Sequence, residues 1–150
     1  RKWKIKHFVR GTLRLKGWAE AWAGIFNEIE TLDGEAGEKR LIEMSEQFWR
    51  DNAYGENEPD RVILCVDLKA ENNNKIIWHK TYKMDAWGDT RGTAMARLVS
   101  HPVSFAVKAI IDNEIEYGVS AAASKSNLVD KWLKDIADLA QEFNIIDRVS

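Results

Sequence analysis

Apolar and polar residues alternate over the first nine positions of the chain. Trp3, Ile5 and Val9 fall on one side of an extended segment, together with His7, and lysines hold most of the opposite side. This period of two predicts a half-exposed strand whose outer face is strongly cationic.

The same alternation returns in the middle of the chain and predicts two more strands, over 61–70 and 75–84. Residues 71–74 between them include three asparagines, which tolerate left-handed backbone angles, so we expect an antiparallel hairpin. Ile63 and Cys65 make the second face of the first of these strands apolar as well. We therefore expect both faces of the sheet to be covered.

Four other segments carry apolar residues at intervals of three or four, the spacing of a helix with one buried side. They cover 17–31, 38–51, 93–111 and, from a cap at Asn127, the stretch to Phe143. Pro102 lies inside the third segment, where the loss of a backbone donor predicts a break or kink near Ser100 and His101. After the fourth segment, residues 145–149 are predicted to form a short strand.

Strands and helices thus fall in separate parts of the chain. This favours an α+β fold, with an antiparallel or mixed sheet covered by helices. A length of 150 residues is typical of one domain. Because the chain starts at Arg1 and enters directly into a predicted strand, we expect a single domain, 1–150, cut from a longer polypeptide.

Net charge and cysteine content indicate which partners and which cellular compartment to expect. The formal net charge of −2 is close to neutral, so the chain as a whole is not expected to bind nucleic acid or an anionic membrane. The only cysteine, Cys65, has apolar neighbours and is expected to be a buried thiol in a reducing compartment. No apolar stretch is expected to span a membrane and no signal peptide is found, which predicts a cytoplasmic protein.

The run from Arg10 to Trp18 joins the first predicted strand to the first predicted helix and contains two glycines. Arg14 and Lys16 lie just before that helix, and a helix N-terminus exposes unpaired N–H groups and a partial positive charge. The run is therefore a candidate receptor for a carboxylate or a phosphate. An ordinary turn with solvated cations explains the same residues.

Metal and nucleophile chemistry find little support in the sequence. His7, His79 and His101 are scattered without a zinc-like spacing, so no metal site is predicted. Cys65 has no base near it in the sequence, which argues against a catalytic thiol. Most of the seven tryptophans fall on helical apolar stripes and are expected in the core, whereas Trp87, beside a glycine, is a candidate wall of a ligand pocket.

Two non-catalytic functions fit the composition. The first is a polyanion-binding module, because seven cations precede residue 17 with no acid among them. These cations are Arg1, Lys2, Lys4, Lys6, Arg10, Arg14 and Lys16. The second is a dimerisation domain, in which an exposed strand edge and surplus aromatic residues pair with a second copy.

Three short motifs follow one another along the chain. They are Thr12-Leu13-Arg14 with the residues to Trp18, Gly88 to Arg97 with Pro102 after it, and Gly118-Val119. Together they resemble the saccharopine dehydrogenase (saccharopine reductase) family. The first is similar to a Thr-Leu-Arg-aromatic-x-Gly-aromatic segment of the family's substrate-binding domain, the second to a Gly-x-Thr-x-Met-x-Arg entry to a helix, and the third to a Gly-Val before the final helix.

The resemblance covers nearly the whole chain in order. Leu15 replaces the family's usual aromatic residue, and 31–57 has no clear counterpart. The resemblance implies the substrate-binding, dimerising domain of an NAD- or NADP-dependent oxidoreductase of lysine metabolism. Such an enzyme interconverts saccharopine with glutamate and an aminoadipate semialdehyde, and carboxynorspermidine or carboxyspermidine is the alternative substrate.

The resemblance also implies which residues bind substrate, because guanidinium groups suit carboxylates and a threonine hydroxyl adds a donor. These residues are Arg10, Thr12, Arg14, Arg91 and Arg97. Asp89 and Thr90 are expected to cap the following helix. Because Gly88-x-x-x-Gly92 lacks the spacing of a dinucleotide site, the cofactor domain is expected to lie outside this chain, which alone would bind no cofactor and be inactive. The implied partners are an amino-acid substrate and a second copy of the chain.

Overall fold

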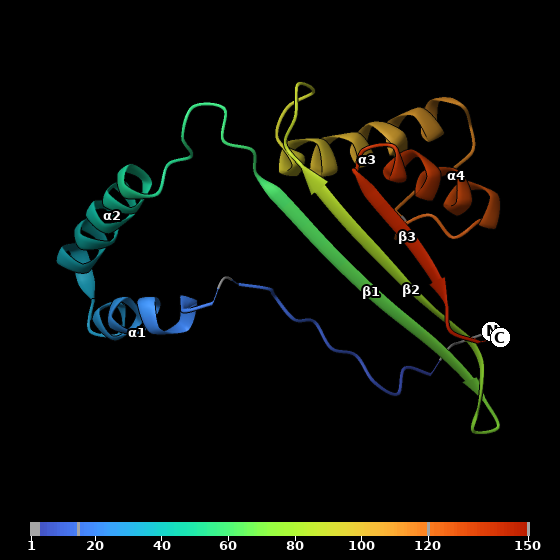
Figure 1. Ribbon diagram of the computed structural model, residues 1–150, viewed down its shortest axis with the longest axis horizontal. Coiled ribbons are helices and arrows are strands. Elements are labelled where there is room, and N and C mark those ends of the chain that lie inside the picture. Colours follow the sequence, from blue (N-terminus) through green and yellow to red (C-terminus); the bar gives the residue numbers. More distant parts are fainter. Residues whose placement is uncertain (1–3, 15, 120, 150) are drawn as a thin grey trace. The chain divides into compact units, whose positions relative to one another are not determined.

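The structure is a computed structural model that describes residues 4–14, 16–119 and 121–149 (Figure 1). The chain divides into two compact units, one up to Ala53 and one from Tyr54 onward. Among the described residues, the first unit contains helices α1 and α2, and the second contains strands β1 to β3 with helices α3 and α4.

The first unit contains two amphipathic helices, α1 (Trp18–Ile29) and α2 (Gly34–Asp51). Gly17 precedes α1 with a φ of 86°, a backbone conformation that favours glycine. The ring of Trp22 on α1 lies 5.6 Å from that of Phe48 on α2, so aromatic contact joins the two helices. Both helices predicted for this region are confirmed, although α2 begins earlier than expected.

The predicted N-terminal strand is wrong for the described residues, because 4–14 form neither helix nor strand. Ile5, Phe8 and Val9 are exposed, and Trp3 lies outside the described residues. Alternation makes one side of a segment apolar, but a strand is stabilised by hydrogen bonds to a neighbouring strand. Residues 4–14 form no such pairing.

The second unit contains an antiparallel sheet in the order β1-β2-β3. Its strands are β1 (Arg61–Asn72), β2 (Lys75–Trp87) and β3 (Glu142–Asp147). The predicted hairpin is confirmed, and its turn uses Asn73 and Asn74 at positive φ angles of 49° and 60°. The arrangement of sheet and helices confirms the predicted α+β class.

The core of the second unit is small and lies between the sheet and the helices α3 (Ala94–Ile111) and α4 (Ser126–Ala137) (Figure 1). Helix α3 packs against β1 and α4. The buried apolar residues of this unit are Met84, Ala86, Ala94, Ala109, Leu128 and Leu139. Most of these side chains are short, so α3 approaches its neighbours closely.

The prediction that both faces of the sheet are covered is wrong. Leu64 pairs with the buried Met84, and successive side chains of a strand point to opposite faces. Ile63 and Cys65 therefore lie on the other face, where both are exposed. The predicted buried thiol is thus an exposed one.

Helix α3 differs from the sequence prediction in its continuity. It runs through Pro102 without a break, so the predicted break is wrong, whereas the kink stays a prediction. Packing at both ends, where Ala94 and Ala109 are buried, offsets the loss of one backbone donor. The helix is also long and apolar enough, by length and composition alone, to cross a membrane. The expectation that no stretch reaches that length is therefore wrong for α3.

The end of the chain also departs from the prediction. The N-cap of α4 is Lys125 and forms no capping side-chain bond, so Asn127 lies inside the helix rather than at its cap. Helix α4 ends at Ala137, and Phe143 belongs to β3. The predicted final strand is confirmed but starts at Glu142, because pairing with β2 extends it toward its N-terminus.

Candidate functional site

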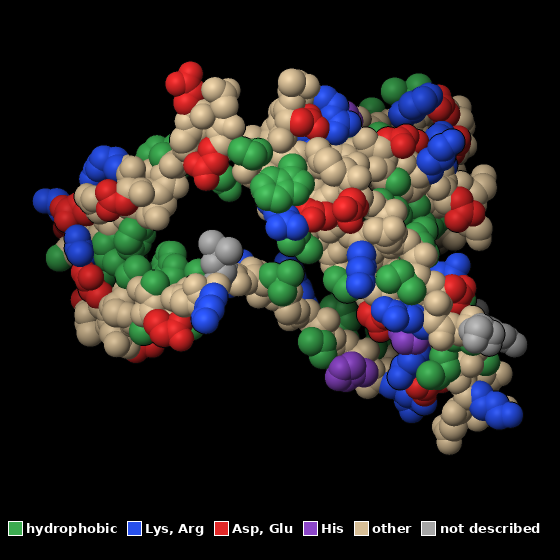
Figure 2. Space-filling view, viewed as in Figure 1, with side chains coloured by type: hydrophobic (Ala, Val, Ile, Leu, Met, Phe, Trp, Pro, Cys, Tyr) green, Lys and Arg blue, Asp and Glu red, His purple; other side chains and the backbone are tan. Residues whose placement is uncertain are grey.

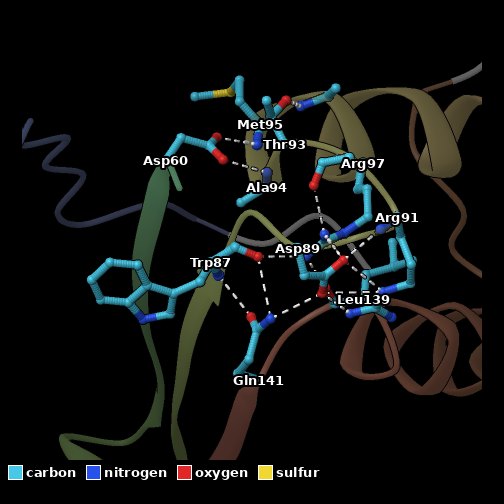
Figure 3. A network of polar contacts seen from close by, with 12 residues as sticks. Asp60, Trp87, Asp89, Arg91, Thr93, Ala94, Met95, Arg97, Leu139 and Gln141 are labelled. Atoms are coloured by element: carbon cyan, nitrogen blue, oxygen red, sulfur yellow. Dashed lines mark hydrogen bonds and ion pairs between the residues drawn. The ribbon is translucent and has the colours of Figure 1, made fainter. Parts of the chain in front are cut away.

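The β2–α3 connection holds a polar network centred on Asp89 (Figure 3). The Asp89 carboxylate accepts hydrogen bonds from the backbone N–H of Arg91 at 2.9 Å and from its Nε and Nη2 atoms at 3.1 and 2.7 Å. It also accepts one from Arg97 Nη1 at 2.7 Å and one from Gln141 Nε2 at 3.2 Å. One carboxylate thus orients two guanidinium groups and ties the connection to the start of β3.

Arg97 is buried, with 3% of its side chain exposed. Besides Asp89, its Nη1 donates to the carbonyl of Gly92 at 2.9 Å. Its Nη2 donates to the carbonyls of Trp87 at 2.8 Å and Leu139 at 3.2 Å. The guanidinium therefore joins the end of β2, the connection and the turn after α4, and its Nε is a buried donor without a hydrogen-bond partner among the described residues.

Arg91 differs from Arg97 in its exposure, since about half of its side chain is accessible (49%). Its Nη1 donates to the carbonyl of Asp138 at 3.0 Å, and its Nε and Nη2 are bound to Asp89. A guanidinium has five N–H donors, so one N–H remains on each terminal nitrogen. Arg91 is therefore fixed at its base and still able to bind a ligand.

A second carboxylate, that of Asp60, caps helix α3 from the segment before β1 (Figure 3). Its two oxygens accept the N–H groups of Ala94 at 2.7 Å and Met95 at 2.8 Å, and Asp60 is itself buried. Thr93 is the N-cap residue, and its hydroxyl accepts from the backbone N–H of Ala96. The prediction that Asp89 and Thr90 cap this helix is therefore wrong.

Gly88 is needed for this arrangement because the backbone approaches Asp60 closely. The N–H of Gly88 donates to the carbonyl of Asp60 at 2.8 Å. A Cβ at position 88 would lie 2.6 Å from Asp60 Oδ1, which is closer than any normal contact. The glycine thus allows the cap and the connection to pack together.

The charges of the network are unequal. Hydrogen bonds from Arg91 lower the pKa of Asp89 far below its usual range, so the carboxylate stays ionised at neutral pH. Asp89 carries one negative charge and the two guanidinium groups carry two positive charges, which leaves an excess of one. Because the guanidinium of Arg97 is buried, the guanidinium of Arg91 presents the excess positive charge to solvent.

The remaining sequence-predicted residues, Arg10, Thr12 and Arg14, belong to the first unit and are exposed. Arg14 donates from Nη1 to the carbonyl of Leu13 at 3.1 Å, and its guanidinium lies 5.4 Å from the ring centroid of Trp18. The structure therefore brings Arg91 and Arg97 together on one carboxylate, while Arg10 and Arg14 lie on a separate exposed segment.

The model of the saccharopine dehydrogenase C-terminal domain matches residues 2–139 of the chain. This range includes both arginine-bearing segments and the second unit up to Leu139, and it ends before β3. The chain belongs to the saccharopine dehydrogenase C-terminal domain family. No solved structure matches it.

The family's name refers to dehydrogenases and so implies a nicotinamide cofactor, whose pyrophosphate could bind at a helix N-terminus. In the β2–α3 region this helix end is the N-terminus of α3. A helix N-terminus binds phosphate through its free N–H groups. At the N-terminus of α3, the carboxylate of Asp60 already accepts the N–H groups of Ala94 and Met95. The residues there do not fit a pyrophosphate.

The histidines and carboxylates of the described residues are not arranged as a metal site. Within the described ranges, no group of three or more His, Cys, Asp or Glu is placed to hold a metal ion. His79 instead lies 3.0 Å from Asp67, which also accepts from the hydroxyl of Thr81 at 2.6 Å. These contacts link β1 to β2 within the sheet.

Sequence reasoning missed Asp60 and Gln141. Asp60 immediately precedes β1 and caps a helix that starts 34 positions later. Gln141 contacts Trp87 across 54 positions. No local pattern marks such contacts. The sequence predicts a cap directly before α3, whereas the residue that precedes β1 supplies it.

Proposed function

We propose that this chain is the substrate-binding domain of an NAD- or NADP-dependent oxidoreductase that acts on a carboxylate-bearing secondary amine. The observation that carries the proposal is the half-exposed guanidinium of Arg91, fixed by Asp89 and the carbonyl of Asp138. Membership of the saccharopine dehydrogenase C-terminal domain family supports an enzyme as the parent protein.

Arg91 has the features that carboxylate binding requires. A carboxylate is bound best by two parallel N–H donors, and the two terminal nitrogens of Arg91 each retain one. Asp89 holds the side chain in place before ligand binds, which reduces the entropy lost on association. The excess positive charge of the network would attract an anionic substrate group.

The other arginines have different roles in this proposal. Arg97 is buried and bonded to protein acceptors, so it acts as a positioning residue that holds Asp89 and the connection. Arg10, Thr12 and Arg14, which belong to the first unit, are proposed separately as carboxylate-binding residues through their exposed donors. Saccharopine is the proposed substrate, and a carboxylated polyamine is the alternative.

Kinetics of the polypeptide that carries this chain would test the proposal. We would follow saccharopine-dependent reduction of NAD and NADP by absorbance for the native sequence, Arg91→Ala and Arg91→Lys. Losing a charge-assisted bidentate contact should raise KM roughly 10- to 100-fold. Lysine keeps the charge but not the fork, so Arg91→Lys should recover little of the loss.

Arg50→Ala is the matched control, since Arg50 is an exposed arginine on α2 in a surface ion pair with Glu46. Its KM should equal that of the native enzyme. An unchanged KM in Arg91→Ala would contradict the assignment of Arg91. Turnover of carboxynorspermidine but not saccharopine would retain the binding role and replace the substrate, and turnover of neither would refute the proposed enzyme.

A further inference from the structure

The turn between α4 and β3, residues 138–141, forms one side of the polar network around Asp89. Its backbone carbonyls accept from Arg91 at 3.0 Å and from Arg97 at 3.2 Å. Gln141, the last residue of the turn, reaches the same network with its side chain (Figure 3). Every residue supplies a backbone carbonyl, so the contacts of Gln141 are the ones that depend on which amino acid the turn contains.

The side-chain amide of Gln141 has one orientation, because each of its polar atoms has a partner. Its Oε1 accepts from the backbone N–H of Trp87 at 2.7 Å. Its Nε2 donates to the carbonyl of Trp87 at 3.2 Å and to Oδ2 of Asp89 at 3.2 Å. A primary amide has two N–H donors, so both are used. Turning the amide over would set its oxygen against a carboxylate and its NH2 group against an N–H.

Gln141 and Arg91 share one oxygen of Asp89. Oδ2 accepts from Arg91 Nη2 at 2.7 Å and from Gln141 Nε2 at 3.2 Å. The other oxygen, Oδ1, accepts from the backbone N–H of Arg91 at 2.9 Å and from Arg97 Nη1 at 2.7 Å. The carboxylate therefore cannot rotate about its Cβ–Cγ bond without losing one of these contacts. Its plane, in turn, sets the direction of the Arg91 guanidinium.

We propose that Gln141 is a positioning residue for substrate binding, which acts through Asp89 to direct Arg91 toward the carboxylate of the substrate. This inference rests on the proposed function, because it concerns the same site. Family membership gives Gln141 no role, since the match ends at residue 139. In this role Gln141 does not touch the substrate. It restricts the positions of Arg91 before binding, which lowers the entropy lost when a carboxylate binds.

Glutamine suits this position better than glutamate. The network carries one excess positive charge, and an amide leaves that excess unchanged. A glutamate at position 141 would have almost the same shape, but its carboxylate would replace an N–H donor that lies 3.2 Å from Asp89 Oδ2. It would cancel the excess charge and repel an anionic substrate group. Gln141→Glu should therefore weaken binding more than Gln141→Leu, which removes the contacts without adding charge.

Kinetics of the polypeptide that carries this chain test the role of Gln141. We would measure KM and kcat for saccharopine in Gln141→Leu, Gln141→Glu and the double variant Gln141→Leu with Arg91→Ala. Loss of one hydrogen bond to a charged group should raise KM roughly 3- to 10-fold and leave kcat within about twofold of the native value. In the Arg91→Ala background, Gln141→Leu should change KM by less than about twofold, because the residue through which it acts is gone.

Gln47→Leu is the matched control. Gln47 on α2 is the other glutamine of the sequence, and it likewise donates to an aspartate, Asp51, at 2.7 Å and accepts from an arginine, Arg50, at 3.1 Å. Its KM should equal that of the native enzyme. If Arg91→Ala raises KM and Gln141→Leu does not, the inference fails and the proposed function stands. The inference also fails if Gln141→Leu raises KM equally with and without Arg91.

A measurement that needs no activity separates failure of the inference from failure of the proposed function. Arg91 Nε donates to Asp89 at 3.1 Å, so its N–H should give a resolved nitrogen–proton signal in the NMR spectrum of the native chain. Gln141→Leu should broaden this signal through faster exchange with solvent, and Gln47→Leu should not. An unchanged Arg91 signal in Gln141→Leu overturns the inference, even if saccharopine is not turned over and the proposed function has to be abandoned.

Discussion

The β2–α3 connection and the Arg10–Trp18 segment contain the same kinds of residue, yet their arginines have different environments. The connection together with the first turn of α3 combines glycine, threonine and two arginines, as the N-terminal segment does. Arg97, in the first turn of α3, is buried, and Arg91, in the connection, is held by Asp89 and a backbone carbonyl. In the N-terminal segment, Arg10 and Arg14 are exposed. The difference lies in acceptors contributed by other elements rather than in the motif itself.

A basic motif becomes a fixed site when several segments supply carbonyl and carboxylate oxygens to it. Arg97 receives acceptors from β2, from the connection and from the turn after α4. Arg14 has a neighbouring carbonyl and the ring of Trp18. Replacing Arg97 should therefore lower the free energy of unfolding strongly, and replacing Arg14 should lower it little.

The largest effect is expected from Arg97→Leu, which tests whether the connection depends on this arginine. The substitution removes a buried charge, one of the donors to Asp89, and the donors that Arg97 supplies to three backbone carbonyls. Breaking a buried pair of this kind costs about 3–5 kcal/mol. Chemical denaturation should show this loss as a lower free energy of unfolding.

Arg97→Lys distinguishes charge from geometry at the same site. An ammonium cannot reach acceptors on three segments at once, so lysine should restore less than half of the stability. Arg50→Leu on the exposed face of α2 serves as the control and should change stability by about 0.5 kcal/mol or less. If Arg97→Leu lowered the free energy of unfolding by less than about 1 kcal/mol, Arg97 would be no more important for stability than an exposed arginine.

The next effect concerns the cap that Asp60 supplies to α3. Asp60→Ala leaves the N–H groups of Ala94 and Met95 without an acceptor, and loss of an N-cap costs about 1–2 kcal/mol. Asp60→Asn keeps one oxygen and should lose about half as much. Hydrogen exchange should show faster exchange at these two amides in both variants.

Thr93→Ala provides the matched comparison for Asp60, because Thr93 caps the same helix from its own N-terminus. If the local cap were sufficient, Thr93→Ala would be more destabilising than Asp60→Ala. We expect the reverse, because Asp60 accepts two buried N–H groups and Thr93 accepts one.

A third effect is the pH dependence that Asp89 confers. Its pKa is lowered in the folded state by Arg91, so its contribution to stability is present above the unfolded pKa of about 3.9 and is lost as the pH falls further. Native stability should therefore decrease below about pH 4. Asp89→Asn should flatten this decrease, measured as the denaturation midpoint against pH.

Asp130→Asn is the control for the pH experiment, since Asp130 is an exposed carboxylate on α4 outside the network. Its acid profile should follow that of the native chain. If Asp89→Asn kept the native slope below pH 4, other carboxylates would account for the acid sensitivity. Asp67 and Asp85, whose pKa values are also lowered by hydrogen bonds, would then be examined next.

The sequence predicted most of the elements because their patterns are local. Helix periodicity identified α1, α2, α3 and α4, and alternation with an asparagine turn identified the hairpin. The sequence prediction failed where the secondary structure of a segment depends on contacts with distant parts of the chain. Alternation in 4–14 is not matched by strand pairing, and Phe143 continues the apolar spacing of α4 but pairs with β2 as part of β3.

The candidate site was predicted in part for the same reason. Arg91 and Arg97 were identified through a motif, but the motif could not show that one is exposed and the other buried. The buried position of Arg97 depends in part on the carbonyl of Leu139, which is distant in sequence. By charge alone, all the arginines are equivalent candidates for binding a carboxylate. Burial distinguishes Arg97 from the exposed Arg91.

The smallest effect is expected from Arg14→Ala. Its guanidinium lies over the ring of Trp18 at an exposed site, where a cation–π contact contributes about 0.5–1 kcal/mol. The free energy of unfolding should therefore fall by less than 1 kcal/mol, whereas KM for a dicarboxylate substrate should rise if the segment binds one. Lys16→Ala, which removes a neighbouring cation, is the control for charge alone. A large stability loss in Arg14→Ala would place this arginine in the same class as Arg97, and an unchanged KM would leave Arg91 as the carboxylate-binding arginine of the chain.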